Sequence, residues 1–243
     1  MELDLSKLDN IEIEGTQESK KKGVVDIIFL LDISGSMGPA IIDIIKNVGT
    51  FVDNLIPEEE SKRLIKDWRA RVFSFGDMES DSAEVKLNVS RPWTQEPQEI
   101  VNQMIECIEL VKQGGGGDEP ESSLDAMYLA ARDGFDSSWT ERTRVIILFT
   151  DATPKKILKE TLGVDADGIA LLSQQITDNH TYVHMYAPVH SDYTAIKNNA
   201  SKYLNYIAIG EDGTSPVEAL KNIDFSKALE TLGKSVSQAS IIA

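Results

Sequence analysis

The stretch that decides the fold is residues 24–36, which read VVDIIFLLDISGS. Residues 24–31 form a nearly continuous apolar run that is long enough for a strand and too short for a helix. Such a run is typical of a parallel strand that is covered on both faces. A polar turn follows at once, so the sequence predicts a buried central strand whose carboxyl end carries Asp32, Ser34 and Ser36.

Segments with strand and helix patterns alternate along the rest of the chain. Apolar residues at three- and four-residue spacing predict a helix over residues 41–55, which Pro57 ends. Residues 145–149 are a second continuous apolar run and predict a second central strand. The other predicted strands are 68–75, 83–89, 181–187 and 203–208, and the other predicted helices are 97–111, 121–133, 166–177, 192–200 and an amphipathic C-terminal helix from Phe225.

This alternation predicts a doubly wound, Rossmann-like α/β fold, with a mostly parallel central sheet, helices on both faces and one antiparallel edge strand. We expect two parts: an N-terminal arm, residues 1–22, and one domain, residues 23–243, which includes the C-terminal helix. The alternating residues 11–14 favour either a short edge strand or a mobile arm.

The charge of the chain argues against several classes of partner. It carries 24 Lys and Arg against 40 Asp and Glu, a formal charge of −16. A surface that binds nucleic acid or anionic lipid needs clustered basic residues, and the one visible cluster, residues 20–22, is short. No apolar run reaches the roughly 18 residues of a membrane span, and the N-terminus lacks the pattern of a signal peptide. We therefore expect a cytoplasmic protein that binds neither nucleic acid nor membrane.

Three polar loops follow predicted strands or open a predicted helix, at residues 32–36, 117–121 and 150–153. Ligands of open α/β sheets bind at the carboxyl ends of the strands. Asp32, Ser34 and Ser36 alternate along their turn, so their oxygens can point the same way, and Asp151 offers a further carboxylate. Hard oxygen ligands of this kind favour Mg²⁺, Mn²⁺ or Ca²⁺. The alternative is a turn whose polar side chains only cap the next helix.

The motif Asp32-Ile33-Ser34-Gly35-Ser36 resembles the Asp-x-Ser-x-Ser motif of von Willebrand factor type A (VWA) domains. Residues 149–151, Phe-Thr-Asp, are similar to the third-loop aspartate motif of the same family, and the resemblance covers roughly residues 24–210. It implies a metal-ion-dependent adhesion site (MIDAS), in which Asp32, Ser34, Ser36 and Asp151 hold Mg²⁺. It also implies a protein partner whose Asp or Glu completes the metal shell.

The second loop departs from the family pattern. Where the family has a threonine, the register of the preceding glycines places Asp118, with Glu119 or Glu121 as alternative ligands. We therefore include Asp118 among the expected metal ligands. A third carboxylate offsets more of the metal's charge, so we expect stronger intrinsic metal binding and less demand for a partner carboxylate.

The resemblance implies a metal-dependent protein-binding module and not an enzyme. Residues 232–240 are similar to the tails of bacterial TerY-like VWA proteins, which implies an adaptor in a bacterial complex linked to stress responses. One alternative is a Mg²⁺-dependent phosphohydrolase with Asp32 as nucleophile, but Ser34 stands where such enzymes carry a second acid. Another is a scaffold whose metal is purely structural.

Overall fold

The computed structural model describes residues 23–59, 65–112, 120–136, 142–210, 213–221 and 223–242. The expected N-terminal arm lies outside the described residues, and so does Asp118. None of the helices in the described ranges combines the length and apolar character that a membrane crossing requires.

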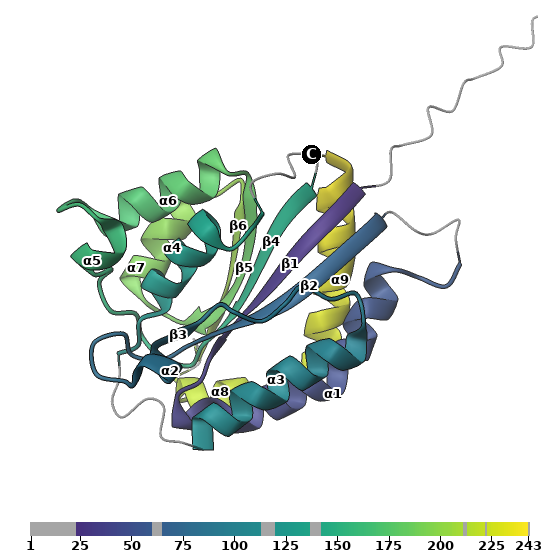
Figure 1. Ribbon diagram of the computed structural model, residues 1–243, viewed down its shortest axis with the longest axis horizontal. Helices are drawn as coiled ribbons and strands as arrows, with labels where there is room; N and C mark the ends of the chain where they lie inside the picture. The colour runs from purple at the N-terminus through teal and green to yellow at the C-terminus, as the bar shows by residue number, and fades with distance from the viewer. Residues whose placement is uncertain are drawn as a thin grey trace, which may run out of the picture.

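A six-stranded sheet with the order β3-β2-β1-β4-β5-β6 forms the centre of the domain (Figure 1). Only β3 pairs antiparallel within this sheet, at its edge, which confirms the predicted mixed sheet. The apolar runs of the sequence form the central strands β1 and β4. The strands are β1 Gly23–Asp32, β2 Ile65–Phe75, β3 Leu87–Asn88, β4 Arg142–Phe149, β5 Thr181–Pro188 and β6 Leu204–Ile209.

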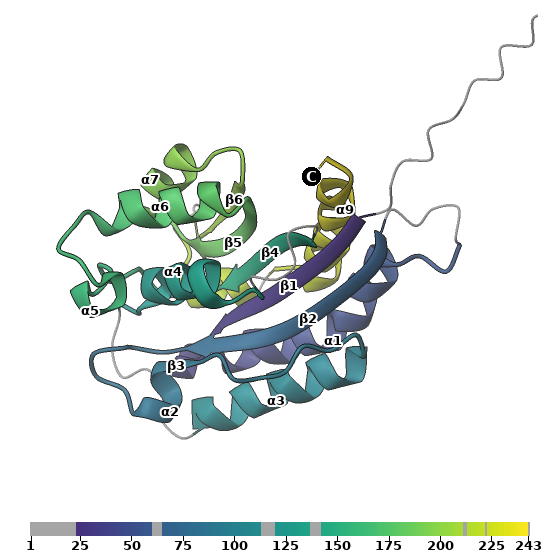
Figure 2. The same ribbon diagram turned by 45° about the horizontal axis from the view of Figure 1, so that its top comes forward.

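Helices cover both faces of the sheet, as Figures 1 and 2 show. One face packs on α1 (Gly38–Leu55), α3 (Pro97–Lys112) and α9 (Phe225–Ile242), and the other on α4 (Ser123–Asp133), α6 (Gly168–Asp178) and α7 (Ser191–Asn199). Alternate residues of β1 serve the two cores: Phe29 belongs to the first and Leu30 to the second, both fully buried. The shorter elements are the 3₁₀ turn Gly35–Met37 and the helices α2 Ala83–Lys86, α5 Lys159–Leu162 and α8 Pro216–Lys221.

The predicted strand 83–89 is wrong over most of its length. Residues Ala83–Lys86 form the short helix α2, and only Leu87–Asn88 pair with β2. The backbone amides of Val85 and Lys86 donate to the Ser82 carbonyl, and this helical turn buries the Val85 side chain in the core. The alternating apolar residues of this segment are therefore used by a helical turn and not by a pleated strand.

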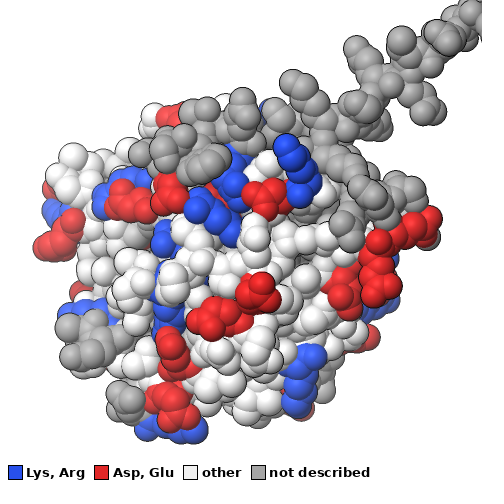
Figure 3. Space-filling model, turned by 45° about the vertical axis from the view of Figure 1, so that its right-hand side comes forward, with Lys and Arg blue, Asp and Glu red and all other residues white. Residues whose placement is uncertain are grey.

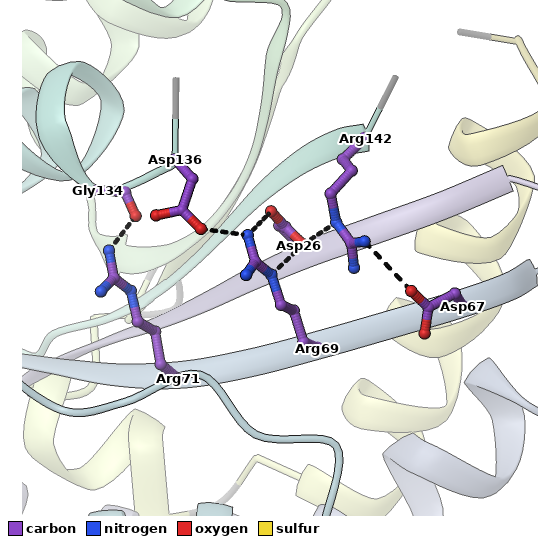
Figure 4. A network of polar contacts seen from close by, with 7 residues as sticks. All are labelled: Asp26, Asp67, Arg69, Arg71, Gly134, Asp136 and Arg142. Atoms are coloured by element: carbon purple, nitrogen blue, oxygen red, sulfur yellow. Dashed lines mark hydrogen bonds and ion pairs between the residues drawn. The ribbon is translucent and has the colours of Figure 1, made fainter. Parts of the chain in front are cut away.

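Asp26 interrupts the apolar run of β1, and an ion-pair network explains how an acid is tolerated there (Figure 4). Asp26 is 1% exposed. The Nε and Nη2 atoms of Arg69 each donate to a different carboxylate oxygen of Asp26 at 2.9 Å, and Arg142 donates to it from β4. Asp136 and Asp67 bind the outer sides of Arg69 and Arg142. The bidentate geometry is the strong form of this contact.

Basic and acidic side chains also stand next to each other on the outer surface. Figure 3 shows one face on which a band of Lys and Arg is interleaved with Asp and Glu. Charges of both signs therefore lie on this face.

We expect Asp26→Asn to lower the free energy of unfolding by about 3 kcal/mol, the low end for breaking a buried ion pair, because each arginine keeps one outer acid. Urea unfolding measures this value. Asp43→Asn, which breaks the exposed pair with Lys46, should change it by less than about 0.5 kcal/mol. Equal effects of the two substitutions would contradict the role given to Asp26.

Candidate metal centre

The parallel register of β1 and β4 brings the first and third polar loops together. Leu31 of β1 pairs with Phe149 of β4, so Asp32 and the pair Thr150-Asp151 leave the sheet at the same edge. The amide of Ile33 donates to the Phe75 carbonyl of β2 at 2.9 Å and fixes the start of the first loop. The first and third loops therefore lie together at the carboxyl edge of the sheet because β1 and β4 pair in parallel.

The carboxylate of Asp32 is fully buried and accepts hydrogen bonds from its own loop and from the third loop. The backbone amide of Ser34 donates to Oδ1 at 2.7 Å, and Thr150 Oγ1 donates to Oδ2 at 2.5 Å. Burial and the nearby Asp151 carboxylate raise the pKa of Asp32 to about 7, while these hydrogen bonds oppose the shift. A cation at this position would offset the charge that burial penalises.

Ser34, Ser36 and Asp151 lie against one another beside Asp32. Ser34 Oγ is 3.3 Å from Ser36 Oγ and 3.4 Å from Asp151 Oδ1. Asp151 is 1% exposed and Ser34 is buried, whereas Ser36 is exposed. The structure thus brings four of the five expected ligands together and leaves the group open to solvent on the Ser36 side.

Glu121 supplies the second loop with a buried carboxylate. Its side chain is only 2% exposed, and its Oε2 atom has no hydrogen-bond partner among the described residues. Burial, then the charges of Asp32, Asp81 and Asp77, raise the pKa of Glu121 to about 8. The charge of Asp32 thus acts on Glu121, which is the described second-loop residue with a buried carboxylate to offer a cation.

The backbone explains why Glu121 is placed there and not on helix α4. Its amide donates to the Thr153 carbonyl at 3.0 Å, and its own carbonyl accepts from the Lys155 amide at 2.8 Å. The predicted helix 121–133 consequently begins at Ser123. The sequence named Glu121 only as an alternative, because a carboxylate early in a helix is favoured by the helix dipole alone.

A fourth loop, which follows β2, contributes residues that the sequence did not single out. Asp77 follows β2 and is fully buried, and Lys155 Nζ lies 2.8 Å from its Oδ2 atom. Burial alone would raise the pKa of Asp77, but hydrogen bonds from Lys155, Ser80 and the Glu79 amide lower it to about 2. The position of Asp77 in the sequence could have indicated its place. It comes two residues after the predicted strand 68–75 and therefore lies at the carboxyl edge of the sheet, like Asp32 and Asp151.

A family model described as the von Willebrand factor type A domain matches residues 26–231. The chain belongs to the VWA family. Domains of this family often carry metal-dependent protein-interaction sites. A search of curated proteins found no match.

Solved structures show the same VWA fold at low sequence identity. Proximal thread matrix protein 1 from the mussel byssus is 15% identical with a TM-score of 0.50, and the match covers 89% of this chain and 46% of that one. The human COPII-coat protein Sec24c is 10% identical with a TM-score of 0.51, covering 88% of this chain and 32% of that one. The VWA chain therefore spans less than half the length of either structure, and the likeness concerns the fold alone.

The donor set of the VWA site suits a hard divalent cation. Asp32, Ser34, Ser36, Glu121 and Asp151 offer carboxylate and hydroxyl oxygens and no sulfur or imidazole. Across the described residues, acidic, His and Cys side chains alone do not form a metal-holding group of three. Metal binding here accordingly needs the serine hydroxyls in addition to the acids.

We expect Asp32→Asn to stabilise the protein in EDTA at pH 8 while it removes a ligand. A carboxyl whose folded pKa is raised from 3.8 to about 7 makes the folded state less stable as pH rises between these values. That shift sets a ceiling of about 4 kcal/mol, and we expect about 1–3 kcal/mol at pH 8, little of it remaining at pH 4. Urea unfolding at both pH values measures the change.

Asp165→Asn is the matched control, because Asp165 is exposed and pairs with Lys159 on the surface. It should change the free energy of unfolding by less than about 0.5 kcal/mol at either pH. If Asp32→Asn instead lowered the free energy of unfolding at pH 8, the charge of Asp32 would not destabilise the metal-free protein.

Proposed function

We propose that the VWA domain binds one divalent cation, Mg²⁺ in the first instance, at the carboxyl edge of β1 and β4 and presents it to a protein partner. One observation supports this most strongly. The carboxylates of Asp32 and Glu121 are both buried, the charge of Asp32 acts on Glu121, and neither forms a salt bridge with Lys or Arg among the described residues. Buried carboxylates normally pair with a cation or bind metal.

The roles of the ligands follow from their burial and contacts. Ser34 and Ser36 supply hydroxyl oxygens, and Asp32 and Glu121 supply carboxylates. Asp151 binds directly or through a water. Mg²⁺ usually keeps waters and takes an outside ligand, so the exposed Ser36 side is where an Asp or Glu of the partner would complete the shell.

Charge determines how strongly the cation depends on that partner. Three carboxylates, those of Asp32, Glu121 and Asp151, more than balance a divalent ion, whereas a shell rich in hydroxyls leaves it positive. The cation therefore binds firmly without a partner, and the partner's acid adds less than it would to a less acidic site. In this proposal Glu121 takes the part that the sequence led us to expect of Asp118.

We further propose that this is an adaptor function and not catalysis. Ser34 stands where the phosphohydrolase alternative needs a second acid, and turnover of a generic phosphoester with Mg²⁺ or Mn²⁺ would favour that alternative. The bacterial, stress-linked context rests only on the likeness of residues 232–240 to TerY-like tails.

We expect Mg²⁺ to bind the wild type with one equivalent by calorimetry and Glu121→Gln at least tenfold more weakly, a loss of about 1.4 kcal/mol or more. Glu160→Gln, at an exposed position on α5, is the matched control and should bind like the wild type. Mg²⁺ affinity unchanged by Glu121→Gln would remove Glu121 from the proposed ligands.

Partner capture tests the second half of the proposal. A protein retained by the wild-type chain in Mg²⁺, but lost in EDTA and lost with Asp32→Ala in Mg²⁺, is the expected outcome. Equal retention in all three arms would leave the cation a structural role only.

A further inference from the structure

Tyr193 of helix α7 brings a hydroxyl group to the loops of the proposed cation site. The side chain is fully buried in the core that α4, α6 and α7 form with the sheet. Its hydroxyl lies 2.7 Å from Ser123 Oγ and donates to the Ala152 carbonyl at 3.2 Å. Ser123 begins α4, two residues after Glu121 of the second loop, and Ala152 belongs to the third loop. One side chain of α7 therefore joins the second loop to the third.

The directions of these hydrogen bonds follow from the chemistry of the groups. A carbonyl oxygen can only accept, so the Tyr193 hydroxyl gives its one proton to Ala152. The Ser123 hydroxyl must then donate to Tyr193. Burial raises the pKa of Tyr193 above its ordinary value, so the phenol keeps its proton and remains a donor. The hydroxyl is thus an acceptor toward the second loop and a donor toward the third.

The third loop extends this connection to Asp32. The Ala152 amide donates to Thr150 Oγ1 at 3.1 Å, and Thr150 Oγ1 donates in turn to Asp32 Oδ2 at 2.5 Å. The charge of Asp32 also contributes to the raised pKa of Tyr193, which places the phenol within electrostatic range of the carboxylate. The first, second and third loops are therefore linked through Tyr193, Ala152 and Thr150.

A backbone bridge holds the second loop at Glu121 as well. The Glu121 amide donates to the Thr153 carbonyl at 3.0 Å, and the Lys155 amide donates to the Glu121 carbonyl at 2.8 Å. Two residues later, Ser123 is bonded to Tyr193. The backbone bridge and the phenol together therefore restrict movement of the second loop away from the third.

The hydroxyl of Tyr193 has a role that its ring does not explain. Phenylalanine would fill the same space in the core, and a buried hydroxyl costs free energy unless it finds hydrogen-bond partners. Tyr206 offers a comparison, because its ring centroid lies 5.9 Å from that of Tyr193 and its hydroxyl donates to the Pro188 carbonyl, outside the three loops. The ring of Tyr193 thus serves packing, whereas its hydroxyl connects the loops.

We propose that the Tyr193 hydroxyl is a positioning group that fixes the second and third loops relative to each other and makes the site select Mg²⁺ over Ca²⁺. Mg²⁺ requires near-ideal octahedral geometry with metal–oxygen distances of about 2.1 Å, whereas Ca²⁺ accepts irregular shells at about 2.4 Å. Loops that cannot spread apart therefore favour the smaller ion. The selectivity rests on the proposed function, whereas the connection between the loops rests on the hydrogen bonds alone.

Calorimetric titration of the full chain with Mg²⁺ and with Ca²⁺ tests the proposal. Tyr193→Phe removes the hydroxyl and keeps the ring. We expect it to bind Mg²⁺ about fivefold more weakly, somewhat less than the loss typical of groups that bond directly to metal ligands. Its Ca²⁺ affinity should fall by less than about twofold, because Ca²⁺ tolerates a looser shell. A general loss of stability would not change the ratio of the two affinities.

Tyr206→Phe is the matched control, since it also removes a hydroxyl that donates to a backbone carbonyl, and it should keep both affinities. Ser123→Ala removes the partner of Tyr193 at the second loop and should also weaken Mg²⁺ binding. The double variant Tyr193→Phe/Ser123→Ala should lose no more affinity than Tyr193→Phe, because both groups act through one chain of hydrogen bonds. An unchanged ratio of Mg²⁺ to Ca²⁺ affinity in Tyr193→Phe would overturn the proposal.

Amide hydrogen exchange in EDTA tests the connection between the loops without a metal. We expect the amides of Glu121 and Lys155 to exchange about fivefold faster in Tyr193→Phe, the factor that one lost hydrogen bond gives, and at the wild-type rate in Tyr206→Phe. Equal rates in Tyr193→Phe and the wild type would also overturn the proposal. A wild type that binds no Mg²⁺ would instead refute the proposed function, and the exchange rates would still decide whether Tyr193 holds the loops.

Discussion

The burial of Asp32 beside Asp151 is the constraint on which the functional edge of the sheet depends. Parallel pairing of β1 with β4 gives the two strands a common carboxyl edge. Because both strands are apolar runs packed in the core, the residues at their ends are buried as well. Like charges brought together out of water destabilise each other unless a cation or a proton intervenes. The pKa of Asp32 is raised because burial and the charge of Asp151 both disfavour its ionised form.

Near the opposite end of β1, a second buried acid, Asp26, is neutralised by arginines. Asp26 and Asp32 occupy alternate positions of β1 and so face the same side of the sheet. Asp26 receives Arg69 and Arg142 and is neutralised within the fold. Asp32 receives hydroxyl and amide hydrogens and no basic partner among the described residues. One acid is thus used for stability, and the other is left for a ligand.

Between these extremes lies the loop after β2, where Asp77 has a lysine in place of an arginine network. The three acids show a gradient of compensation: complete at Asp26, supplied by one tethered ammonium at Asp77, and absent from the described contacts of Asp32. A buried charge that lowers the stability of the fold is expected where the function of a site requires that charge.

The sequence predicted those features that depend on local pattern. Continuous apolar runs predicted the central strands, and the turn after residue 31 predicted that Asp32, Ser34 and Asp151 would meet. It missed Lys155 and Asp77 because their pairing joins residues 78 apart, which no local pattern specifies. It ranked Glu121 below Asp118 because only the backbone bridge to Pro154 takes Glu121 out of the helix. The segment 83–89 was misread because a helical turn and a strand can both bury Val85.

The most direct test of the account is a crystal structure grown with Mn²⁺ in which the metal is located by its anomalous scattering. The account predicts one peak within coordination distance of Ser34, Ser36 and Glu121, and none between Lys155 and Asp77. An empty carboxyl edge in crystals that hold Mn²⁺ elsewhere, with Asp32 still bound by Thr150 and Ser34 alone, would contradict it.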